Sequence, residues 1–159
     1  MNENENYVDN LNGRREFFNR NFPKINREET NRNSSDILKN TCPVCGYLTL
    51  DERENFEICG ICSWEDDGVD DFNKNVNSGP NHLTLEEGRK IFQKAKQKLF
   101  TENFSENDFI NNLKDEFLKL DKLIEKTELE KTEIIKVHEE IINLMQKKKI
   151  YGLEKLYDK

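Results

Sequence analysis

The sequence predicts a small α+β protein in which a zinc-ribbon-like β-hairpin, held by four cysteines, is followed by an α-helical C-terminal part. Three observations lead to this fold class. All four cysteines lie in two Cys-x-x-Cys pairs, thirteen residues separate the pairs, and apolar side chains recur at helical spacing after residue 84. We expect three parts: an N-terminal helix with a flexible lead-in (1–41), a metal-binding ribbon with an acidic loop (42–83) and a helical region (84–159).

An apolar cluster near the start of the chain predicts one short helix. The helix would run from about Tyr7 to Asn21, and Pro23 would end it. Residues 26–40 are polar and charged except for Ile37 and Leu38, which is typical of a flexible lead-in, although a helix packed over the ribbon is an open alternative. The apolar cluster consists of Leu11, Phe17, Phe18 and Phe22.

The cysteine spacing predicts one metal site. A tetrahedral zinc ion takes four thiolates at about 2.3 Å, and each Cys-x-x-Cys turn can supply two adjacent ligands. Between the pairs, residues 46–50 and 55–58 favour β-strands joined by a polar turn, so a hairpin would bring the second pair beside the first. The predicted ligands are Cys42, Cys45, Cys59 and Cys62.

The four cysteines could instead form disulfides or bind iron. Disulfides need an oxidising compartment, but residues 1–10 contain no secretory signal, so we expect a cytoplasmic protein with reduced thiols. Iron also accepts four sulfur ligands. Zinc is the cofactor that we favour, and iron is the alternative.

The charge distribution limits the class of partner. Residues 42–83 contain two Lys/Arg and nine Asp/Glu, which accounts for the whole net charge of −7. Nucleic-acid binding depends on Lys and Arg that neutralise phosphates, so a nucleic-acid-binding zinc ribbon is the weaker hypothesis. A basic protein partner fits this charge better.

An acidic loop follows the second cysteine pair. We expect Trp64 to cover the metal site, because tryptophan buries a large area. The aspartates do not match the ligand spacing of an EF-hand calcium loop, so a solvated loop or a partner-binding surface is the better interpretation. The predicted partner contacts are Trp64, Glu65, Asp66, Asp67, Asp70 and Asp71.

Residues 42–93 resemble a known bacterial family of small cysteine-rich proteins named for a Cys-Pro-Cys-Cys motif. The resemblance rests on four stretches: 42–50 (Cys-Pro-Val-Cys-Gly-Tyr-Leu-Thr-Leu), 56–59 (Phe-Glu-Ile-Cys), 64–67 (Trp-Glu-Asp-Asp) and 79–89 (Gly-Pro-Asn-His-Leu-Thr-Leu-Glu-Glu-Gly-Arg). Val44 replaces the additional cysteine, and Gly60 replaces a common proline. The resemblance implies a metal-binding module, and toxin genes beside some relatives imply an immunity role.

The C-terminal half has helical patterns. Thr84 with Glu87 forms a capping box, and Ser105 with Asp108 forms a weaker one. Apolar residues from Ile110 to Ile124 and in a later segment alternate in steps of three and four, as in a coiled coil. Either a helical hairpin that turns at 127–130 or one long helix would satisfy this pattern, and a homodimer could form through these helices.

The two histidines differ in context. His138 lies in an apolar row, which favours a core or interface role, whereas the role of His82, in the loop before Thr84, is undecided. The sequence shows no nucleophile with a nearby base and no glycine-rich phosphate loop, so we expect no enzyme. It also has no apolar run long enough to cross a bilayer.

Two functions from different classes therefore remain. The first is a non-enzymatic, metal-stabilised protein-binding module, with toxin neutralisation as its sharpest version. The alternative is a rubredoxin-like iron electron carrier.

Overall fold

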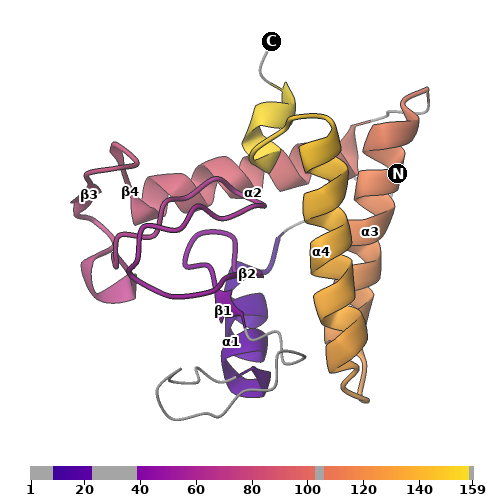
Figure 1. Cartoon of the computed structure of the whole chain (residues 1–159), viewed down its shortest axis with the longest axis horizontal. Helices are drawn as coiled ribbons and strands as arrows, with labels where there is room; N and C mark the ends of the chain where they lie inside the picture. Colours follow the sequence, from indigo (N-terminus) through magenta and orange to yellow (C-terminus); the bar gives the residue numbers. More distant parts are fainter. Residues whose placement is uncertain (1–8, 23–38, 103–105, 158–159) are drawn as a thin grey trace.

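In the part of the chain that the structure describes, four α-helices and four very short strands lie in and around the cysteine segment, residues 42–62 (Figure 1). This computed structural model describes residues 9–22, 39–102 and 106–157. The helices are α1 (Leu11–Asn21), α2 (Leu85–Thr101), α3 (Asp108–Glu125) and α4 (Lys131–Lys147), with short 3₁₀ helices η3 (Asp71–Asn73) and η4 (Leu153–Tyr157). The strands are β1 (Asn40–Thr41), β2 (Leu48–Leu50), β3 (Asn77–Ser78) and β4 (Leu83–Thr84). The small α+β class predicted from the sequence is confirmed.

The strand pairing differs from the predicted hairpin. β2 pairs antiparallel with β1, with Asn40 opposite Leu50, rather than with residues 55–58. Each cysteine pair therefore lies at the tip of its own short hairpin, because β1 and β2 enclose the first pair and the Ile58–Glu65 bridge encloses the second. Positive φ at Glu54 and Phe56 explains the difference, since an extended strand needs negative φ.

Helix α1 begins at Leu11, and the two described residues before it, 9 and 10, are not helical. Asn10 caps it, and its side chain accepts a hydrogen bond from the Gly13 N–H at 3.0 Å. Phe18 of the predicted apolar cluster is fully buried. The predicted start at Tyr7, Pro23 and most of the flexible lead-in lie outside the described residues.

The C-terminal region contains a helical hairpin, so one of the two predicted arrangements is confirmed. α3 and α4 lie side by side in Figure 1, and the chain leaves the helical conformation at Lys126. α3 is capped by Asn107, whose side chain accepts from the Ile110 N–H; the predicted cap Ser105 lies outside the described range. Thr84 caps α2 as predicted, accepting from the Glu87 N–H at 3.1 Å.

None of the helices in the described segments is long and apolar enough to cross a bilayer. The predicted homodimer stays a prediction. The apolar seams of α3 and α4 are buried within the chain, and examples are Leu113, Phe117, Ile134 and Ile141.

One hydrophobic core joins all three predicted parts. Phe18 from α1, Tyr47 from the cysteine segment and Phe117 from α3 are completely buried in it. The Tyr47 ring lies edge-on to the Phe92 and Phe117 rings, at centroid distances of 6.2 and 5.7 Å. The cysteine segment is thus packed between helices rather than standing apart from them.

His138 links α4 to β2 through the core, as expected for a core histidine. Its Nε2 accepts the Leu48 backbone N–H at 3.1 Å, so the opposite ring nitrogen, Nδ1, carries the proton and donates to the Ile134 carbonyl at 2.7 Å. Burial lowers the pKa of His138 to about 4, because the interior disfavours the charged ring.

The low pKa of His138 predicts a stability loss in mild acid. Because the folded-state pKa lies below the value of 6.5 for a free histidine, the unfolded chain binds more protons as the pH falls from 6.5 towards 4. The free energy of unfolding should fall across this window by up to about 3 kcal/mol. Urea unfolding at pH 7 and pH 5 measures it, with His138→Gln as the control. An equal fall in both proteins would contradict the assignment.

Candidate metal centre

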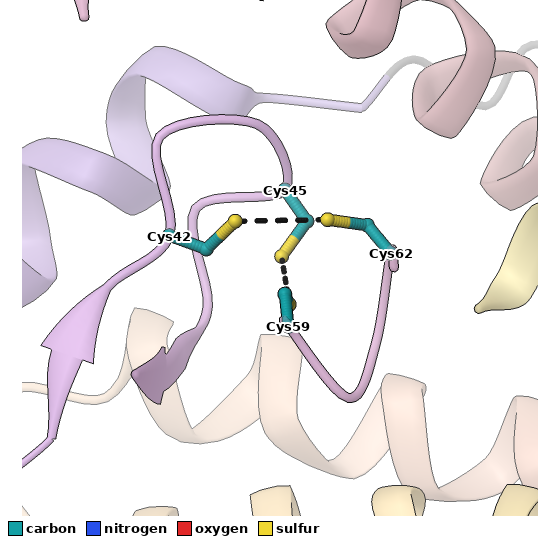
Figure 2. A group of neighbouring side chains, drawn as sticks. All are labelled: Cys42, Cys45, Cys59 and Cys62. Atoms are coloured by element: carbon teal, nitrogen blue, oxygen red, sulfur yellow. Dashed lines mark hydrogen bonds between the residues drawn. The ribbon is translucent and has the colours of Figure 1, made fainter. Parts of the chain in front are cut away.

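The four cysteine sulfurs meet at one point in the core (Figure 2). All four Sγ atoms lie within 4.8 Å of one another, and all four residues are buried. The Cys42–Cys62 and Cys45–Cys59 sulfur distances are both 3.6 Å. Four sulfurs bound tetrahedrally at 2.3 Å would be separated by about 3.8 Å. The cluster therefore has the dimensions and the donor type of a four-thiolate metal site.

The first Cys-x-x-Cys turn is closed by its own backbone. The Gly46 N–H donates to the Cys42 carbonyl at 2.9 Å, and the Cys42 N–H donates to the Tyr47 carbonyl at 2.8 Å. Gly46 has φ of 76°, a left-handed conformation that glycine adopts at no steric cost. This turn brings the side chains of Cys42 and Cys45 to the same side.

The second turn repeats this geometry with different residues. The Ser63 N–H donates to the Cys59 carbonyl and the Cys59 N–H donates to the Trp64 carbonyl, both at 2.9 Å. Ser63 has φ of 64° at the place that glycine occupies in the first turn. The sequence contains this repeat as Cys-x-x-Cys-Gly-Tyr and Cys-x-x-Cys-Ser-Trp, a signal that the analysis of cysteine spacing missed.

Three of the four buried thiols have shifted pKa values. Burial raises the pKa of the Cys45 and Cys62 thiols, because a buried thiolate lacks hydration. Burial also acts on Cys59, but hydrogen bonds from the other three thiols and from Thr49 outweigh it and lower the pKa of this cysteine. A bound divalent ion would hold all four groups as thiolates and release their protons.

Comparison with known proteins supports the predicted resemblance. Residues 40–104 match the family model described as Cysteine-rich CPCC. This match includes both cysteine pairs, the acidic loop and α2. No curated protein and no solved structure matches the chain. We call residues 40–104 the CPCC segment, and the helical hairpin lies outside it.

Helix α1 is anchored to the CPCC segment by a buried arginine. Arg14 donates from Nε to the Cys45 carbonyl at 2.9 Å, and its guanidinium carbon lies 4.3 Å from the centre of the Tyr47 ring. It also forms a bidentate ion pair with Asp9, at 2.7 and 2.9 Å. Burial acts against ionisation of Asp9, but Arg14 and then Lys96 hold its pKa at about 2.

A second buried cation completes this cluster. Lys96 of α2 lies 3.0 Å from Asp9 and 3.3 Å from Asp121 of α3. Two cations thus face two anions, which compensates their burial. Sequence analysis missed Asp9, Arg14, Lys96 and Asp121, because nothing in their spacing shows that three helices bring them together.

The predicted partner contacts include two buried side chains. Trp64 is 3% exposed, and the edge of its ring packs on Gly88 of α2, where an added Cβ would lie 3.0 Å from it. Asp66 is fully buried, and its carboxylate accepts from Arg53 Nε at 2.7 Å and from the Glu54 N–H at 2.9 Å. In this structure neither side chain is accessible to a partner, so both act inside the fold.

Two more of the predicted contacts belong to an arginine–aspartate network. Asp70 accepts from Arg53 at 3.0 Å and from Arg15 at 2.9 Å. Asp71 accepts from Arg15 at 2.8 Å and from Arg89 at 2.7 Å. These carboxylates tie the acidic loop to α1 and α2.

Three of the four aspartates in the acidic loop, Asp66, Asp70 and Asp71, are thus engaged by arginines. Arg89 extends the network to the first cysteine turn, where its Nε donates to the Pro43 carbonyl at 2.8 Å. In the part of the chain that the structure describes, the four cysteines form the one cluster able to hold a metal ion. His82 is exposed, outside this cluster, and has a left-handed backbone with φ of 57°.

Replacing Cys42 or Cys59 with serine should unfold the CPCC segment. A structural metal site contributes folding energy directly, and three remaining thiolates bind the ion more weakly. Circular dichroism melting and metal analysis of each variant check this. Wild-type melting temperature together with wild-type metal content would contradict the prediction.

Replacing Arg53 with glutamine should destabilise the protein by about 3 kcal/mol, because it leaves the buried carboxylate of Asp66 without its cation. The double variant Arg53→Gln/Asp66→Asn should recover part of this loss. Lys126→Gln is the control, because the Lys126–Glu130 pair is half exposed and should contribute less than about 1 kcal/mol. Chemical denaturation measures all three, and equal effects at both sites would contradict the proposed role.

Proposed function

We propose that this chain is a non-enzymatic protein-binding protein whose fold depends on one structural metal ion, which we take to be zinc. The convergence of four buried sulfurs carries this proposal. Four cysteine ligands fill the coordination of a tetrahedral ion and leave no open position for a substrate or an activated water. A closed site of this kind supports a structural role.

The alternative is a rubredoxin-like iron electron carrier, because iron accepts the same four thiolates. Metal content separates the two functions. Protein purified from cells supplied with both metals should contain one equivalent of zinc per chain and be colourless. A red protein containing one equivalent of iron would contradict the structural role and favour electron transfer.

The binding surface that we propose lies on the stem of the second cysteine turn. We define the stem patch as Glu54, Phe56, Ile58 and Glu65. Phe56 and Ile58 are 59% and 63% exposed, and Ile58 bridges to Glu65 across the stem. An exposed apolar pair framed by acidic residues fits a basic protein that offers its own apolar side chain.

Charge supports a basic partner even after the internal pairing is counted. The ion pairs described above, together with that of Lys39, engage Asp51, Asp66, Asp70 and Asp71. Within the described residues, Glu54, Glu57, Glu65 and Asp67 form no ion pair. This excess repels phosphate, which argues against a nucleic-acid partner.

Neutralisation of a bacterial toxin is the sharpest version of this function, and it rests on the family resemblance. The test expresses the candidate toxin, encoded by a neighbouring gene, in cells with and without this protein. We expect this protein to restore growth of the cells and to form a complex with the toxin that weakens as the salt concentration rises. The double variant Phe56→Ser/Ile58→Ser should bind at least roughly tenfold more weakly.

Val76→Ser is the matched control, because Val76 is 54% exposed but lies outside the stem patch. Equal losses in the control and the patch variant would contradict the assigned surface. Tighter binding to RNA or DNA than to the protein would contradict the function.

A further inference from the structure

The sulfur of Cys59 has surroundings that the other three sulfurs lack. The Thr49 hydroxyl donates to Cys59 Sγ at 3.0 Å, and the Ile61 N–H donates to it at 3.4 Å. Both hydrogen bonds end on the Cys59 sulfur. Within the described ranges, the other three sulfurs accept hydrogen bonds from cysteines alone. The centre is therefore chemically asymmetric.

Thr49 lies between this sulfur and a cleft. It belongs to β2, is half-buried, and lines a cavity of about 270 Å³ between β2 and α4. Ile142 of α4 lines the same cavity and packs against Gly60 of the second turn. Cys59 itself is only 1% exposed, so Thr49 and Ile142 shield it from this side.

Cys62 lies on a different and more open side of the cluster. It is the most exposed of the four ligands, at 6%, and lines a cavity of about 250 Å³ together with Trp64 and Asn81. A small reagent that enters this cavity therefore reaches the residue Cys62.

We propose that Thr49 makes Cys59 the protected sulfur of the metal centre, so that electrophiles attack the centre first at Cys62. A hydrogen bond to a thiolate stabilises the lone pair that would attack an electrophile, and charge-assisted bonds of this kind are stronger than neutral ones. The inference rests on the proposed metal binding. It adds to that function a residue that controls how the centre is opened.

Thr41 provides a matched control on the neighbouring strand. It is the last residue of β1, directly before Cys42, and it is buried. Its hydroxyl has no hydrogen-bond partner within the described residues. Thr41→Val and Thr49→Val make the same change of a hydroxyl to a methyl group in paired strands. Thr49→Val removes a hydrogen bond to sulfur, whereas Thr41→Val removes none.

The test treats the full-length, zinc-loaded protein with iodoacetamide. A cysteine sulfur attacks the reagent carbon, a sulfur–carbon bond forms as iodide leaves, and the resulting thioether binds metal poorly. Peptide mass spectrometry gives the rate at each cysteine, and a chromophoric chelator reports zinc release. In the wild type, Cys62 should be alkylated first.

Thr49→Val should accelerate alkylation of Cys59 by roughly three- to tenfold, whereas Thr49→Ser and Thr41→Val should stay within about twofold of the wild-type rate. With cobalt in place of zinc, Thr49→Val should also shift the sulfur-to-metal charge-transfer band to longer wavelength. Thr49→Ala gives the same comparison if the valine variant does not fold.

Two results would overturn the inference: alkylation that begins at Cys59 in the wild type, or hydroxyl-free variants at position 49 that react like the wild type. A wild-type protein that binds no metal would be detected by metal analysis before alkylation. That result would overturn the proposed function, and this inference with it.

Discussion

The convergence of four sulfurs is the constraint on which the rest of this structure depends. Two Cys-x-x-Cys turns, each closed by its own pair of backbone hydrogen bonds, bring Cys42, Cys45, Cys59 and Cys62 into one buried cluster. The strands beside these turns are only two or three residues long and would not persist alone. One ion bound by the sulfurs would join both turns, and the helices then have a fixed surface on which to pack.

Buried and half-buried polar side chains hold the helices to that surface. Arg14 connects α1 to the first turn, Arg89 connects α2 to it, and His138 connects α4 to β2. Arginines also take up much of the acidity of the loop after the second turn, so this loop is an ordered part of the fold. Glu54 and Glu65, which lie outside these ion pairs, belong to the stem patch. We therefore propose the stem patch as the partner surface, in place of Trp64 and Asp66.

Local features of the fold could be predicted from the sequence, whereas features that depend on distant contacts could not. The cysteine spacing identified the cluster, the Thr84 cap identified the start of α2, and the apolar row identified His138 as a core residue. The predicted hairpin was wrong because positive φ at Glu54 and Phe56 interrupts the second strand. Asp66, which we predicted to contact a partner, is buried against Arg53. Two of the arginine partners of the loop aspartates, Arg15 and Arg89, come from helices far away in the sequence, which no local pattern reveals.

X-ray absorption at the metal edge of the purified, full-length protein tests the central claim most directly. The four-sulfur arrangement predicts one ion per chain, surrounded by four sulfur atoms at about 2.3 Å, with zinc as the absorbing element. An absence of bound metal would contradict the account. A first shell with nitrogen or oxygen in place of one or more sulfurs would contradict it equally, because the centre would then not be the closed structural site on which the fold depends.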